Sequence, residues 1–63
     1  MEIKDIIKTR RVELSMTQAQ LATAVGVSEA TISRWESGDI TGIKHTRLIP
    51  LANALHISPL ILV

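Results

Sequence analysis

The chain has 63 residues, a formal net charge of +1 and 46% hydrophobic residues, with Trp35 as its single aromatic residue. This length allows one small domain with an aliphatic core, because a domain of this size buries only roughly 60% of the surface of its unfolded chain. The absence of cysteine excludes a disulfide framework and a cysteine-ligated zinc site, and the small net charge excludes the strongly basic class of nucleic-acid-binding proteins.

The first predicted helix spans residues 2–14. Its apolar side chains recur at the intervals of three and four that place residues on one face of a helix. They are Ile3, Ile6, Ile7 and Leu14. The segment is therefore expected to be amphipathic, with this stripe facing the core.

The second predicted helix opens at Thr17. Thr17 and Gln20 have the T-x-x-Q spacing of a capping box, in which each side chain bonds the backbone N–H of the other. The inner face of this helix is expected to consist of Leu21, Ala22 and Val25. Gly26 follows at the point where a helix end requires a residue that tolerates a left-handed backbone, so we expect the helix to end there.

The third predicted helix runs from Ser28, its expected cap, to Glu36. Glu29 lies in the first turn, where a negative charge interacts favourably with the helix dipole. Ile32 and Trp35 share the inward face. Because no second aromatic residue exists, Trp35 is interpreted as a core residue rather than as a stacking platform for bases.

The rest of the chain predicts a loop and two more helices. Residues 39–45 show no periodicity. Thr46 is expected to cap a fourth helix that reaches Leu55, with Pro50 near its start, where a missing N–H removes little hydrogen bonding. Ser58 and Pro59 are expected to begin a short fifth helix. With no strand pattern and no repeat, the predicted fold is all-α, a compact bundle of five short helices in one domain, residues 1–63.

The second and third helices, joined at Gly26, resemble the helix-turn-helix of the Cro/CI-type phage repressor family, also called the lambda-repressor-like or XRE family. That motif has a small residue in its first helix, glycine in the turn and an aliphatic residue in its second helix, here Ala22, Gly26 and Ile32. The segment ATISRWESG is also similar to the family's, as are five short helices with a loop after the third. The resemblance covers residues 3–62, and it leaves open a short Cro-like protein or the N-terminal domain of a longer repressor.

The resemblance implies that residues 28–36 form a recognition helix lying in the major groove of DNA. The residues then expected to face the bases are Glu29, Ala30, Ser33 and Arg34. Arg34 can donate two hydrogen bonds to guanine, Ala30 can pack on a thymine methyl group, and Glu29 can accept from cytosine N4. The plainer alternatives are a solvated charge for Arg34 and a partner of the helix dipole for Glu29.

A second set of residues is expected to contact phosphates. It comprises Gln18, Ser28, Thr31, Ser37, Lys44 and His45. Gln18 and Ser37 are assigned by the resemblance, the hydroxyl groups of the third helix can equally be caps, and the last two belong to the loop. The resemblance also implies a structural ion pair between Arg11 and Glu36, which links the first and third helices.

These features predict a sequence-specific regulator of transcription, a phage or bacterial repressor that binds a two-fold symmetric operator in double-stranded DNA as a homodimer. No enzymatic activity is expected, because the sequence lacks a catalytic constellation and the chain is too short to enclose a pocket of ~300 Å³. His45 and His56 lack the spacing of metal ligands, so no metal and no cofactor is expected.

The charged N-terminal segment is unlike a signal peptide, and no apolar run approaches the ~20 residues of a membrane span, so a cytoplasmic protein without a membrane or small-molecule partner is expected. The alternative function is a protein-interaction module, such as an antitoxin subunit that binds a toxin and binds DNA secondarily. Binding of single-stranded RNA is disfavoured because the aromatic platform is missing.

Overall fold

The computed structural model describes residues 2–40, 43 and 45–62, with His45 and Leu62 described by their backbone alone. Its helices are α1 (Ile3–Glu13), α2 (Gln18–Val25), α3 (Glu29–Glu36), α4 (His45–Ala54) and the 3-10 helix η1 (Pro59–Leu62). All regular structure among the described residues is helical, so the all-α prediction is confirmed. None of the described helices is long and apolar enough to cross a membrane.

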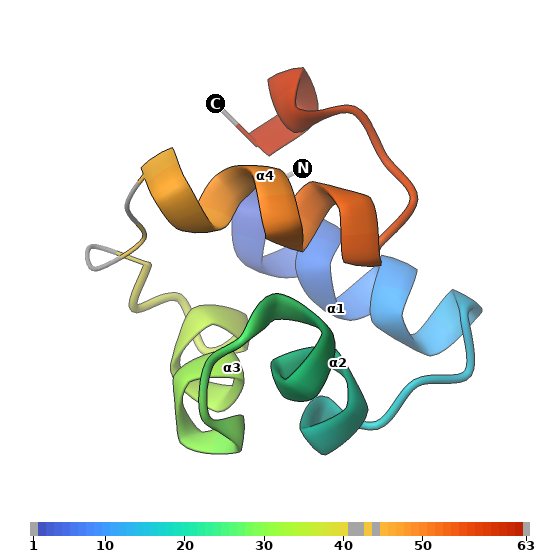
Figure 1. The fold of residues 1–63 in the computed structure, drawn as a ribbon, viewed down its shortest axis with the longest axis vertical. Coiled ribbons are helices and arrows are strands. Elements are labelled where there is room, and N and C mark those ends of the chain that lie inside the picture. The colour runs from blue at the N-terminus through green and yellow to red at the C-terminus, as the bar shows by residue number, and fades with distance from the viewer. Residues whose placement is uncertain (1, 41–42, 44, 63) are drawn as a thin grey trace.

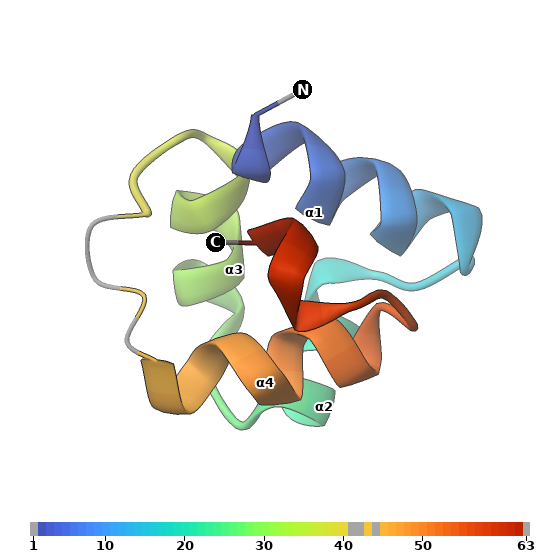
Figure 2. The same cartoon turned by 90° about the horizontal axis from the view of Figure 1, so that it is seen from above.

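The helices pack into a nearly isometric body with principal-axis extents of 23 × 20 × 19 Å. In Figure 1, α4 lies in front of α1, with α2 and α3 below them. The pair α2 and α3 pack on each other, α4 packs on α2, and α1 packs on α3. Figure 2 shows η1 turning back toward α1 from its place on α4. The packing leaves one side of α3 outside the bundle.

Among the described residues, nine apolar ones are buried and form the core, and they come from all four α-helices and the turn after α4. They are Ile7, Leu21, Ala22, Val25, Ile32, Trp35, Leu51, Ala52 and Leu55. Trp35 is only 4% exposed and packs in the same cluster as Ile32, which confirms its interpretation as a core residue. From the predicted stripe of α1 only Ile7 is fully buried, while Ile3 and Ile6 pack against the edge of the cluster.

The predicted ends of α2 and α3 are confirmed. The hydroxyl oxygen of Thr17 accepts a hydrogen bond from the Gln20 N–H at 3.0 Å, and the Gln20 side-chain oxygen accepts one from the Thr17 N–H at 2.8 Å. Ser28 caps α3 by accepting a bond from the Thr31 N–H at 3.2 Å. Gly26 ends α2 with a left-handed φ of 87°. Gly26 and the Ser28 cap thus define how the chain leaves α2 and enters α3.

Replacing Gly26 with alanine should destabilise the fold through the backbone. The added Cβ would stand 3.5 Å from Arg47 Nη1, an ordinary contact, so the cost comes from the left-handed conformation, about 1–2 kcal/mol for an L-residue. Asparagine tolerates this conformation better, so Gly26→Asn should lose less than Gly26→Ala in thermal melts. Equal losses in the two variants would contradict a purely backbone origin.

Two predictions about the C-terminal half are wrong in detail. The fifth element is not an α-helix but a 3-10 helix of four residues, η1, in keeping with the short lengths at which 3-10 geometry is used. α4 begins at His45, so Thr46 is its second residue and does not cap it. A threonine cap signal locates a helix end only to within one or two residues. Pro50, in the helix interior, removes the one backbone bond that would reach the Thr46 carbonyl.

Candidate nucleic-acid interface

One side of α3 is exposed along its whole length. Ile32 and Trp35 hold the opposite side in the core. The four residues predicted to read bases are all exposed on this helix, and they are Glu29, Ala30, Ser33 and Arg34. The structure thus brings the four side chains together on the outer side of the helix, and their contact with bases stays a prediction.

A chain of hydrogen bonds joins three polar side chains of this helix. Arg34 Nη2 donates to Thr31 Oγ1 at 3.3 Å, and Thr31 Oγ1 lies 2.9 Å from Ser28 Oγ. Ser28 Oγ also accepts the capping bond from the Thr31 N–H. Thr31 and Ser28, both predicted to contact phosphates, are therefore bonded within their own helix.

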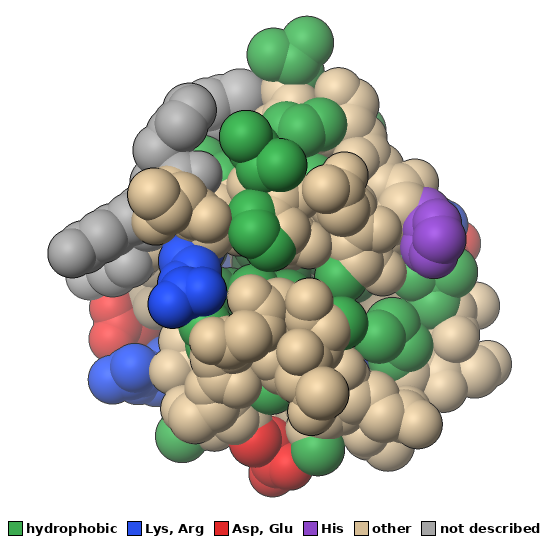
Figure 3. Space-filling view, viewed as in Figure 1, with side chains coloured by type: hydrophobic (Ala, Val, Ile, Leu, Met, Phe, Trp, Pro, Cys, Tyr) green, Lys and Arg blue, Asp and Glu red, His purple; other side chains and the backbone are tan. Residues whose placement is uncertain are grey.

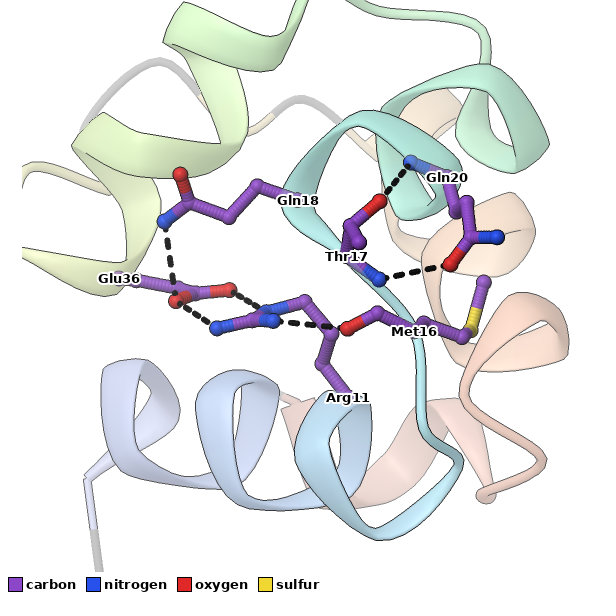
Figure 4. A network of polar contacts seen from close by, with 6 residues as sticks. All are labelled: Arg11, Met16, Thr17, Gln18, Gln20 and Glu36. Atoms are coloured by element: carbon purple, nitrogen blue, oxygen red, sulfur yellow. Dashed lines mark hydrogen bonds and ion pairs between the residues drawn. The ribbon is translucent and has the colours of Figure 1, made fainter.

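Arg11 and Glu36 form an ion pair between α1 and α3, drawn in Figure 4. Arg11 Nε donates to Glu36 Oε2 at 2.6 Å and Arg11 Nη2 to Glu36 Oε1 at 3.1 Å, which is a bidentate arrangement. Arg11 Nη1 donates in addition to the Met16 carbonyl at 2.8 Å. The two side chains are only 13% and 5% exposed, so the pair is largely shielded from water.

The start of α2 lies beside the end of α3. Gln18 is the first residue of α2, and its Nε2 donates to Glu36 Oε1 at 3.3 Å (Figure 4). An amide nitrogen carries two hydrogens, so the second one is available to a ligand. Ser37, the C-terminal cap of α3, is exposed, and its hydroxyl donates to the Arg34 carbonyl at 2.8 Å. The two predicted phosphate contacts are thus placed at neighbouring helix ends.

The two loop residues that are predicted to contact phosphates are described only in part. Lys44 lies outside the described residues, and His45 is described only as the first residue of α4. The sequence prediction missed Arg47, which is exposed and whose Nη1 lies 3.5 Å from the Cβ position of Gly26, at the turn between α2 and α3. A cation in the first turn of a helix opposes the helix dipole, and this is the signal that could have drawn attention to Arg47.

Among the described residues, charged side chains of both signs lie on the face shown in Figure 3. On the face shown in Figure 3, lysine and arginine side chains stand as separate groups, with acidic side chains near them. This distribution agrees with the net charge of +1. In the part of the chain that the structure describes, no three histidine or acidic side chains gather as a metal site.

Comparison with known proteins identifies the arrangement. A family model described as helix-turn-helix matches residues 7–62. The P22 c2 repressor, solved in complex with a synthetic operator, superimposes with a TM-score of 0.92 and 36% identity over 100% of this chain and 94% of that one. The solution structure of the DNA-binding domain of the same repressor gives a TM-score of 0.89 and 37% identity, over 98% of this chain and 80% of that one.

One curated relative is much longer than this chain. The type II methyltransferase M1.ScrFI of Lactococcus lactis subsp. cremoris is 51% identical over 41 residues, 60% of this chain and 10% of the methyltransferase. The chain therefore spans about a tenth of the length of that relative. Because the family model covers nearly the whole chain and the fold agrees throughout, this chain belongs to the helix-turn-helix family of the Cro/CI (XRE) type.

Proposed function

We propose that the chain is a sequence-specific regulator of transcription, a repressor that reads double-stranded DNA in the major groove with α3. The observation that carries this proposal is the exposed, polar outer side of α3, on a helix held in place by the burial of Ile32 and Trp35 and by the cap at Ser28. It is supported by the match in fold to a repressor that was solved in complex with a synthetic operator.

The proposed interface divides its tasks between two sets of residues. Glu29, Ala30, Ser33 and Arg34 present groups that differ in what they accept from or donate to base edges. Phosphates are alike at every site, so contacts from helix-end amides and from Gln18 and Ser37 orient the protein without reading sequence. The loop residues Lys44 and His45 are proposed to add backbone contacts.

We propose that two copies act together on a two-fold symmetric operator. One recognition helix covers only a few base pairs, and repressors of this type place two such helices ~34–36 Å apart, about one turn of DNA. Residues 1–63 are proposed to form one DNA-binding domain that acts without cofactor or catalysis. The cytoplasm of a bacterium, where phage and bacterial operators are found, is its proposed location.

Selection of bound sites from random duplex DNA tests this function. The expected result is a two-fold symmetric consensus, saturated by two copies of the chain in footprinting and sedimentation. The affinity should fall less steeply with salt than the slope near −10 of a large repressor, because few phosphates are neutralised by a chain of net charge +1.

Two outcomes would contradict parts of the proposal. Saturated, specific binding of a single copy to one half-site would show that the pairing is wrong. Failure to enrich any duplex would overturn the regulator and favour the protein-interaction module, which co-purification with a toxin partner would then support.

A further inference from the structure

Arg34 is the longest side chain on the exposed side of α3, and its guanidinium makes a hydrogen bond within the helix. Its Nη2 donates to Thr31 Oγ1 at 3.3 Å, one turn toward the N-terminus of the helix. Residues three apart on a helix are neighbours, so the Thr31 hydroxyl is placed to receive this group. The bond directs the guanidinium toward the half of α3 expected to lie closest to the bases.

The Thr31 hydroxyl is itself held in place. Its Oγ1 lies 2.9 Å from Ser28 Oγ, and the Thr31 N–H donates to the same serine oxygen at 3.2 Å. Ser28 is the N-terminal cap of α3, so its position is set by the helix start. The acceptor offered to Arg34 is therefore tied to the N-terminal cap of the helix.

We propose that Thr31 is a positioning residue for Arg34 and that it sets base specificity rather than binding a phosphate. This inference rests on the proposed function, because it assigns a role within the same DNA-reading surface. A guanidinium carries five N–H donors, and the bond to Thr31 uses one on Nη2. One hydrogen on Nη2 and those on Nη1 stay available, so the two parallel donors required by guanine O6 and N7 are kept.

The conformational entropy of the Arg34 side chain explains why such positioning matters. An arginine that is immobilised only on binding loses side-chain entropy at that moment, whereas one already tethered loses less. This smaller loss of entropy strengthens binding only at sites where Arg34 contacts a base. Loss of the Thr31 hydroxyl should therefore weaken binding to the selected site and leave binding to unrelated DNA unchanged.

Thr31→Val tests this inference, because valine keeps the branched shape and the backbone N–H bond to Ser28 while it removes the hydroxyl. Affinity for the selected duplex should fall about three- to tenfold, with no change on a scrambled duplex. Thr31→Ser restores a hydroxyl and should recover most of the loss. In an Arg34→Ala background the Thr31→Val effect should vanish, because the two changes remove one interaction.

The matched control is Thr23→Val on the exposed side of α2. The Thr23 hydroxyl donates to the Ala19 carbonyl at 3.1 Å within its own helix, so its removal should leave the ratio of affinities unchanged. Circular dichroism checks that both valine variants fold, and Thr31→Ala repeats the measurement should valine disturb the helix.

The outcomes separate the inference from the function on which it rests. Equal weakening on both duplexes by Thr31→Val would assign Thr31 to a phosphate and overturn the positioning role. The positioning role would also be overturned if Thr31→Val and Thr31→Ala both left the ratio of affinities for the selected and scrambled duplexes unchanged. A wild-type chain that binds neither duplex would instead refute the proposed function, and the positioning role with it.

Discussion

Glu36→Gln and Arg11→Met should each lower the free energy of unfolding by about 3–5 kcal/mol. Removing one partner of a shielded pair leaves the other charge away from water without compensation. The pair here is bidentate and only 13% and 5% exposed, and Glu36 also accepts from Gln18. A chain of 63 residues is stabilised by about 3–9 kcal/mol in total at the usual value per residue, so either variant should lose at least about a third of the stability of the fold.

Thermal and urea melts measure this effect, and Glu13→Gln is the matched control. Glu13 accepts from Arg10 in an ion pair on the surface, 3.4 Å long, and its side chain is 56% exposed, so loss of the pair should cost no more than about 1 kcal/mol. The double variant of Arg11 and Glu36 should lose less than the sum of the single losses. Single variants that melt within a few degrees of wild type would contradict a stabilising role for the pair.

The features of the fold that sequence could predict are those whose partners are close along the chain. The capping box of Thr17 and Gln20 joins residues three apart, and Gly26 supplies the left-handed backbone conformation that the end of α2 requires at that one position. Helical periodicity places Ile32 and Trp35 on the buried side of α3 because the period of the helix is known before the fold is. Such local features were sufficient to define the helix-turn-helix.

Features that depend on tertiary packing were predicted less well. The stripe of α1 has the correct spacing, yet only Ile7 is fully buried, since the depth of each residue depends on how α1 crosses its neighbours. The choice between an α-helix and a 3-10 helix after Pro59 is likewise a matter of how four residues close onto α4. Periodicity carries no information on either point.

In the candidate site, too, local features could be predicted from sequence and features that depend on three-dimensional contacts could not. Sequence alone indicated which residues of α3 face outward, because this follows from the period of the helix. It did not indicate that the Arg34 guanidinium bonds Thr31, since several rotamers of so long a side chain are open to it. Arg47 was missed because it meets the turn at Gly26 from a position 21 residues further along the chain.

Arg34→Ala should collapse the specificity of DNA binding while it leaves nonspecific affinity nearly unchanged. A bidentate contact between arginine and guanine is worth roughly 1–3 kcal/mol of discrimination, so affinity for the selected duplex should fall about 5- to 150-fold. Arg34 is exposed, and within the part of the chain that the structure describes its guanidinium bonds only Thr31 of the same helix, a contact that the fold does not require. Stability should therefore be retained, and fluorescence or gel-shift titrations on selected and scrambled duplexes measure the ratio directly.

Two further variants separate reading of bases from simple attraction to DNA. Arg34→Lys keeps the positive charge but lacks the planar pair of donors, so it should also lose specificity while it retains nonspecific affinity. Gln18→Ala removes an amide placed at the start of α2 and should weaken both duplexes to a similar degree, since phosphates are the same in each. If Arg34→Ala and Arg34→Lys both leave the ratio of affinities intact, Arg34 reads no base, and the exposed side of α3 serves a protein partner instead.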